Sequence, residues 1–84
     1  MKEIVINCSK IGSMSEMHEI LARELNFPDW YGKNLDALFD CLTELEDEIF
    51  LVLAGWIQTS YSGGFESVFA DAATENESFS YTLA

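Results

Sequence analysis

Two aspartates in the middle of the chain have the spacing of a binding site for a cationic group. Asp36 and Asp40 are four residues apart in a segment with helical periodicity, so both carboxylates lie on one helix face, with Phe39 at its edge. Like charges at this spacing destabilise a helix by roughly a few tenths of a kcal/mol. Two carboxylates and an aromatic ring could bind a pocket rich in guanidinium groups. They could also be the solvated side of an ordinary amphipathic helix.

A catalytic use of Asp36 and Asp40, as the acid/base pair of a glycosidase, is the alternative from another class of function. Two aspartates one turn apart on an exposed, convex helix lack the cleft that excludes water and separates their pKa values. We therefore expect a protein that is not an enzyme.

Large aromatic side chains precede this helix. Trp30 and Tyr31 lie in a segment bounded by Pro28 and Gly32, where we expect a loop. Large aromatic residues in such loops often contact partners rather than the core.

The remaining sequence predicts the elements that position these residues. Short apolar runs at 3–7 and 79–83 predict strands, and the continuous apolar run 49–54 predicts a fully buried central strand. Helices are expected from the S-x-x-E capping box at Ser13, from the N-cap Asn34 through about Leu45, and over 65–74 after Gly63-Gly64. The inward faces of the three helices should hold Met14, Met17, Leu21 and Leu25; Leu35, Leu38, Leu42 and Leu45; and Val68, Phe69 and Ala72.

Strands separated by helices favour parallel pairing. We expect one small two-layer α/β domain over residues 1–84. A hydrophobic content of 49% argues against intrinsic disorder despite the high charge.

The net charge of -11 defines the partners that the surface can attract. Such a surface repels nucleic-acid backbones and anionic membranes and favours a basic protein.

The apolar run 4–6 is too short for a signal peptide or a membrane span, and we expect a cytoplasmic protein. The acidic run Glu44, Glu46, Asp47 and Glu48 is either solvated surface or part of an acidic binding face.

No pattern in the sequence predicts a metal ion or a cofactor. Cys8 and Cys41 are far apart without a C-x-x-C pair, and no EF-hand spacing is present. We expect both cysteines to be reduced and buried, with a disulfide between them as the alternative. His18 has no second ligand residue at a suitable spacing and is expected at the boundary of the core, with its hydrogen bonds satisfied.

The segment 27–43, FPDWYGKNLDALFDCLT, resembles the signature of the barstar family, the intracellular inhibitors of barnase-type ribonucleases. The run Y-G-x-N-L-D-A-L-x-D-C-L is long and specific in its order, and the order of elements agrees over essentially the whole chain. The resemblance implies a three-stranded parallel sheet with helices packed on it and no catalysis. It also implies a one-to-one complex in which the chain plugs the active site of a secreted, basic ribonuclease.

The resemblance also implies roles for individual residues. Asp40 matches the carboxylate that enters the phosphate subsite of the enzyme, and Asp36 matches one that meets an arginine at its edge. Trp30 stands where the family has a tyrosine that stacks over the catalytic histidine, and Phe39 stands where it often has tryptophan. Further positions implied at the contact rim are Gly32, Asn34, Thr43, Glu44 and, on the last helix, Asp71.

Trp30, Phe39 and Glu44 depart from the family pattern. These departures favour the alternative, an acidic protein-interaction or immunity module whose target is not a barnase-type ribonuclease.

Overall fold

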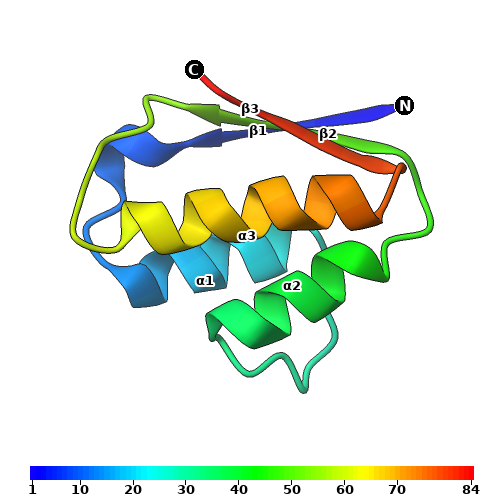
Figure 1. The fold of residues 1–84 in the computed structure, drawn as a ribbon. Coiled ribbons are helices and arrows are strands. Elements are labelled where there is room, and N and C mark those ends of the chain that lie inside the picture. Colours follow the sequence, from blue (N-terminus) through cyan, green and yellow to red (C-terminus); the bar gives the residue numbers. More distant parts are fainter.

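A three-stranded parallel sheet forms one layer of the molecule, and three helices form the other (Figure 1). The structure is a computed structural model that describes residues 1–84. Strand order in the sheet follows chain order, β1–β2–β3, which confirms the predicted parallel α/β arrangement. The elements are β1 (Lys2–Asn7), the 3-10 turn η1 (Cys8–Lys10), α1 (Met14–Glu24), α2 (Leu35–Thr43), β2 (Ile49–Ala54), α3 (Ser62–Glu75) and β3 (Phe79–Leu83).

Strand β2 lies in the centre of the sheet, as its continuous apolar run predicts. It is not fully buried, however, because its residues alternate between buried and half-buried along the strand. Leu51 and Leu53 face the helices and are buried, whereas Phe50 and Val52 face the other side. All three helices cover the same face of the sheet (Figure 1), so the opposite face has no covering layer.

Helix α1 begins as the capping box predicts, because the Ser13 side chain accepts a hydrogen bond from the Glu16 amide at 3.2 Å. Met17 and Leu21 are buried, but Met14 in the first turn is 45% exposed and does not belong to the core. His18 is also not at the core boundary as expected, since it is only 1% exposed.

Helix α2 begins at the predicted cap, Asn34, and ends at Thr43, two residues before the predicted end at Leu45. Leu38, Leu42 and Cys41 are buried along one side. The predicted leucine stripe is therefore buried in its middle and only partly buried at its ends.

Helix α3 begins before the glycine pair that was expected to precede it. Gly63 and Gly64 lie in its first turn, which starts at Ser62. A Cβ atom at Gly64 would lie 2.8 Å from Cδ1 of Leu35, so the absence of a side chain there allows α3 to pack closely on α2. Phe65, Phe69 and Ala72 face the core, and Phe65 was not among the predicted core residues.

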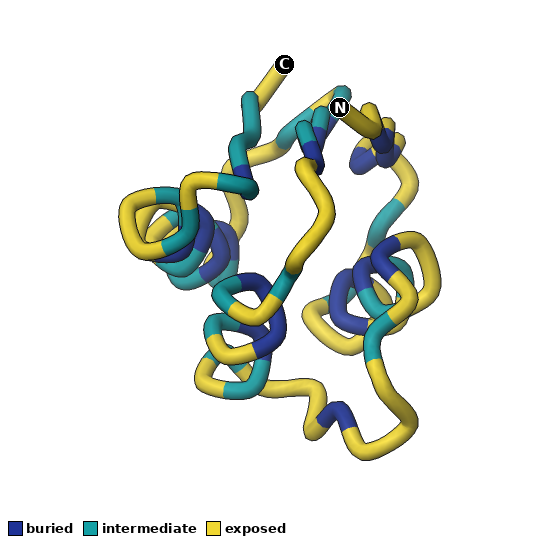
Figure 2. Tube along the Cα trace, turned by 90° about the vertical axis from the view of Figure 1, so that its right-hand side faces the viewer, coloured by how far each residue is buried: buried dark blue, intermediate teal, exposed yellow.

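The buried side chains form one cluster between the sheet and the helices. Figure 2 shows that the buried stretches of the helices lie on the sides that face one another and the sheet. Cys8 and Cys41 both belong to this cluster and are free thiols. No helix has both the length and the apolar character that crossing a membrane requires.

Candidate functional site

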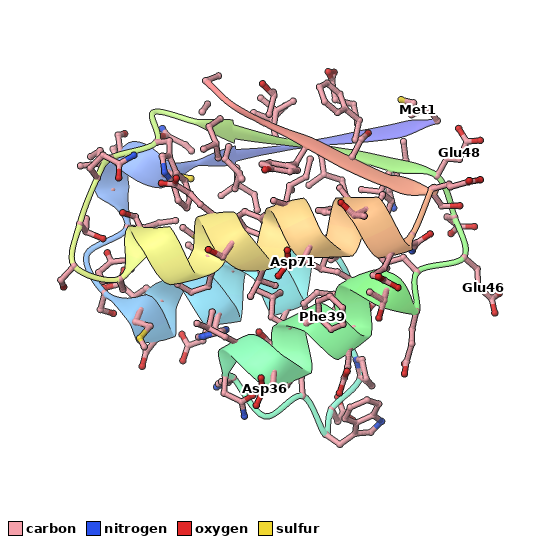
Figure 3. The ribbon with its side chains drawn as sticks, in the orientation of Figure 1. Met1, Asp36, Phe39, Glu46, Glu48 and Asp71 are labelled. Carbon is pink, nitrogen blue, oxygen red and sulfur yellow. The ribbon has the colours of Figure 1, made fainter.

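The predicted contact residues gather on α2, on the loop that precedes it and on the adjacent side of α3. We call the set Trp30, Gly32, Asn34, Asp36, Phe39, Asp40, Thr43, Glu44 and Asp71 the contact face. Figure 3 shows Asp36, Phe39 and Asp71 from one side of the molecule, where α2 and α3 pack together. Because α2 and α3 pack together, Asp71 of α3 lies on the same side of the molecule as the contact residues of α2.

The two aspartates of α2 are exposed and have no partners within the chain. Asp36 and Asp40 are one helical turn apart, a spacing that places the Cβ atoms roughly 5–6 Å from each other. The structure contains two ion pairs, Arg23–Glu24 and Lys33–Glu19, and neither includes these aspartates. Their carboxylates also take no part in the side-chain hydrogen bonds of the chain. The helix dipole favours the charge of Asp36, which lies in the first turn, but gives little to Asp40 in the middle of the helix.

Phe39 and Asp71 complete the exposed centre of the contact face. Phe39 is half-buried and packs against the core, which fixes its ring while leaving part of it accessible. Asp71 is exposed on α3 and, like the α2 aspartates, forms no ion pair. One aromatic surface and three unpaired carboxylates thus lie on two helices that pack against each other.

Gly32 and Asn34 build the beginning of α2. The Asn34 side-chain carbonyl accepts a hydrogen bond from the Ala37 amide at 2.8 Å, and its NH2 group donates to the Gly32 carbonyl at 3.3 Å. A Cβ atom at Gly32 would lie 3.0 Å from Nδ2 of Asn34, so glycine leaves room for this cap. Both residues therefore hold the contact helix in place as well as lying on its exposed rim.

Thr43 and Glu44 end the same helix. The Thr43 hydroxyl donates to the backbone carbonyls of Phe39 and Asp40, at 2.9 and 3.0 Å, so its proton is already engaged within α2. Glu44 is the exposed C-cap. It lies eight residues after Asp36, about 12 Å along the helix axis, so it belongs to the far edge of the contact face rather than to its centre.

Asn76 is a positioning residue that the sequence did not reveal. Its side-chain NH2 group donates at 2.9 Å to the backbone carbonyl of Leu42, in the last turn of α2, and at 3.0 Å to that of Leu45, just beyond the helix. Its side-chain oxygen accepts from the Ser78 amide at 2.9 Å. In the sequence, Asn76 is only an asparagine that follows a helical segment. This pattern does not indicate that its side chain binds the end of a different helix, α2.

The two aromatic residues of the loop have opposite environments. Trp30 is 67% exposed, as predicted, whereas Tyr31 is 7% exposed and does not belong to the contact surface. The Tyr31 hydroxyl lies 2.6 Å from Nδ1 of His18, and its ring packs on Phe27 with centroids 4.9 Å apart. Tyr31 anchors the loop to the core, and Trp30 next to it faces solvent.

Burial shifts the pKa values of several groups around this anchor. It lowers the pKa of His18 and raises that of Tyr31, to which the nearby Cys41 contributes. Burial also raises the pKa of Cys41, with smaller contributions from Glu44 and Asp40, and raises the pKa of Cys8. Both thiols are therefore protonated and poorly reactive at neutral pH.

The aspartate pair lies on an open part of the surface. The surface has three hollows, and neither Asp36 nor Asp40 lines any of them. No group of three or more His, Cys, Asp or Glu side chains is placed to hold a metal ion. The acidic run after α2 extends away from the centre of the contact face, with Glu48 near Met1 and Glu46 on the same side of the molecule (Figure 3).

Comparison with known proteins adds to this geometry. The model of the family described as "Barstar (barnase inhibitor)" matches residues 1–84. A relative from Bacillus subtilis (strain 168), named "Putative ribonuclease inhibitor YrdF", is 38% identical over 76 residues, which cover 89% of this chain and 80% of the relative. The chain belongs to the barstar family.

Proposed function

We propose that the chain is an inhibitor of a basic, secreted ribonuclease, which it binds one to one by covering the active site with the contact face. The observation that carries this proposal is the pair of exposed, unpaired carboxylates of Asp36 and Asp40 on a helix capped at both ends. Membership of a family described as barnase inhibitors, and the name of the Bacillus relative, support the same role.

The chemistry of the target explains why carboxylates would serve. An enzyme that cleaves RNA must stabilise a phosphodiester, so its site presents arginine, lysine and histidine donors in a cleft with little water. A carboxylate can accept hydrogen bonds from several of these donors in place of the phosphate, without offering a bond to cleave. In this proposal Asp40 enters the phosphate subsite and Asp36 pairs with an arginine at its edge.

The aromatic residues would supply the apolar part of the interface. Trp30 is exposed beside the buried anchor Tyr31, so it could stack on a ring of the enzyme without a large loss of backbone freedom. One side of the Phe39 ring packs against the core. Aromatic anchors on a fixed support are typical of the residues that contribute most to binding.

A titration of ribonuclease activity tests the proposal. A fixed amount of a basic microbial ribonuclease of the barnase type is mixed with increasing amounts of the protein, and the cleavage of RNA is followed. We expect activity to disappear at one equivalent. Full activity at a severalfold excess over every such enzyme tried would instead favour an interaction module with another target.

A charge-matched pair of variants controls for the overall acidity. The double change Asp36→Asn and Asp40→Asn should abolish the stoichiometric end point. The double change Glu3→Gln and Glu77→Gln removes the same charge from exposed positions outside the contact face and should preserve the end point. Equal loss in both variants would mean that net charge, not the contact face, governs binding.

A further inference from the structure

The loop of residues 26–34 carries Trp30 but has few contacts with the rest of the molecule. Most of its residues are exposed, and Tyr31 is its one buried side chain. Three polar links join it to α1: the Phe27 amide donates to the Ala22 carbonyl at 2.9 Å, the Tyr31 hydroxyl lies 2.6 Å from Nδ1 of His18, and Nζ of Lys33 lies 3.5 Å from Oε1 of Glu19. The ion pair is exposed and contributes little, and the Phe27 bond lies at the start of the loop, so the contact with His18 is the polar anchor next to Trp30.

His18 occupies a position that an apolar side chain could fill at lower cost. It is 1% exposed and packs on the Phe65 ring with centroids 4.9 Å apart. Its Nε2 atom is buried and has no hydrogen-bond partner. A buried polar atom without a partner opposes folding, so the imidazole requires a reason beyond packing. Its one polar contact is Tyr31.

We propose that His18 is a positioning residue for target binding: it holds Tyr31 in the core and thereby fixes the loop that presents Trp30. The inference rests on the proposed function insofar as Trp30 contacts the target. It adds a residue that lies outside the contact face and touches no partner itself.

The buried environment suits the neutral imidazole. A protonated His18 has N–H groups at both Nδ1 and Nε2, so it could no longer accept a hydrogen bond from the Tyr31 hydroxyl, and its Nε2–H group would be buried without an acceptor. The titratable neighbours are Tyr31 from the loop and, beyond it, Cys41 from α2, while α3 contributes the apolar ring of Phe65. Glu19, next in the chain, is exposed and paired with Lys33. None of these groups stabilises a cation at His18. Acidification should therefore favour states in which His18 leaves the core, and the loop that it anchors is then released.

Two variants separate positioning from packing. Tyr31→Phe removes the hydroxyl and keeps the ring. His18→Asn retains an amide near the place of Nδ1, has no atom in the place of Nε2 and cannot be protonated. Ile4→Val, a small change in the buried core under the sheet, serves as a control for general loss of stability.

Hydrogen exchange of backbone amides measures the loop without any target. The Tyr31 amide donates to the Pro28 carbonyl at 3.0 Å and reports on the loop, whereas amides of β2 report on global unfolding. From pH 7.5 to about 5.5, after correction for the intrinsic exchange rate, we expect loop protection in the wild type to fall at least fivefold relative to β2. In Tyr31→Phe it should be low throughout, and in His18→Asn it should not change with pH.

Inhibition of the ribonuclease provides the second readout. At pH 7.5, Tyr31→Phe should bind roughly tenfold more weakly than the wild type, the effect of one ordinary hydrogen bond, and His18→Asn should be closer to the wild type. Ile4→Val should bind like the wild type. As the pH is lowered, the affinity of the wild type should decrease relative to that of His18→Asn. The ratio of the two affinities is used because titration of the enzyme itself affects both inhibitors equally.

The outcomes are distinguishable. If Tyr31→Phe leaves both the loop-to-sheet exchange ratio and inhibition at wild-type values, the positioning role is wrong. If the exchange results are as expected but the wild type inhibits no ribonuclease, the anchor stands and the proposed function fails.

Discussion

The side-chain amide of Asn76 donates hydrogen bonds to the carbonyl of Leu42, at 2.9 Å, and to that of Leu45, thereby joining the end of α3 to the end of α2. The Leu42 carbonyl lies in the last turn of α2, where carbonyls lose their regular helical donors, and it also accepts a long hydrogen bond from the Leu45 amide at 3.4 Å; the Leu45 carbonyl lies just beyond the helix. The distal end of the contact face is thus fixed by a residue 34 positions further along the chain. Asn34 fixes the proximal end through a local cap.

Asn76→Ala should lower the free energy of unfolding by about 1–3 kcal/mol, because it removes two hydrogen bonds and leaves the Leu45 carbonyl without its donor. Asn76→Asp should be at least as harmful, since a carboxylate would face the same carbonyl oxygens. Urea denaturation of the three proteins measures both effects. Wild-type stability in Asn76→Asp would show that the two donated bonds contribute nothing.

The two glycines of α3 should respond differently to alanine. A Cβ atom at Gly63 would meet nothing within 4 Å, so Gly63→Ala should stabilise the protein by about 0.5–1 kcal/mol through better helix propensity. At Gly64 the same gain is opposed by the contact with Leu35 at 2.8 Å, so Gly64→Ala should be less stable than Gly63→Ala. Thermal melts of the two variants check this order, and the reverse order would contradict the close packing of α2 on α3.

Stability should fall as pH is lowered from about 7.5 to 5.5. The unfolded chain takes up a proton at His18 near pH 6.5, whereas the folded protein, in which burial lowers the pKa of His18, takes it up only at lower pH. The unfolded state therefore binds more protons in this range, and stability is lost at up to about 1.4 kcal/mol per pH unit.

His18 is the only histidine in the chain, so one variant isolates its contribution. In His18→Asn the free energy of unfolding, measured in urea at several pH values, should be nearly flat over the same range. Equal pH slopes in the variant and the wild type would assign the effect to the carboxylates instead.

Association with the ribonuclease should slow as salt is added. The chain carries a net charge of -11, and a basic enzyme would be attracted over distances comparable with the Debye length, about 8 Å near 0.15 M salt. Stopped-flow measurement of the association rate between about 0.05 and 0.5 M salt tests this. A rate that does not depend on salt would mean that the acidic surface does not steer the encounter.

The features that sequence predicted correctly are those determined by neighbouring residues. The caps at Ser13 and Asn34 depend on side chains three residues from their partners, and the central place of β2 follows from its apolar run. The exposure of Asp36, Asp40 and Trp30 follows from helix periodicity and loop composition.

The errors involve residues whose role depends on distant partners. Tyr31 is buried with its hydroxyl against His18 of α1, and the close approach of Leu35 from α2 favours a glycine at position 64 within α3. Phe50 and Val52 are only half-buried because all the helices lie on one face of the sheet. None of these partners can be identified from the local sequence.

The central claim is that Asp40 exists for binding and not for folding, and Asp40→Ala tests it most directly. Its carboxylate has no partner in the free protein, so the variant should have an equal or slightly higher melting temperature, because repulsion from Asp36 is removed and alanine favours the helix. In the complex, several cations of the enzyme would lose their partner, at a cost of about 3–5 kcal/mol in affinity. Glu3→Ala, which removes an exposed charge from β1, is the matched control and should change neither quantity appreciably. Inhibition titrations and thermal melts on the same samples should therefore show a loss of roughly two to four orders of magnitude in affinity without a loss of stability. Unchanged inhibition by Asp40→Ala, or a marked drop in its melting temperature, would contradict the claim.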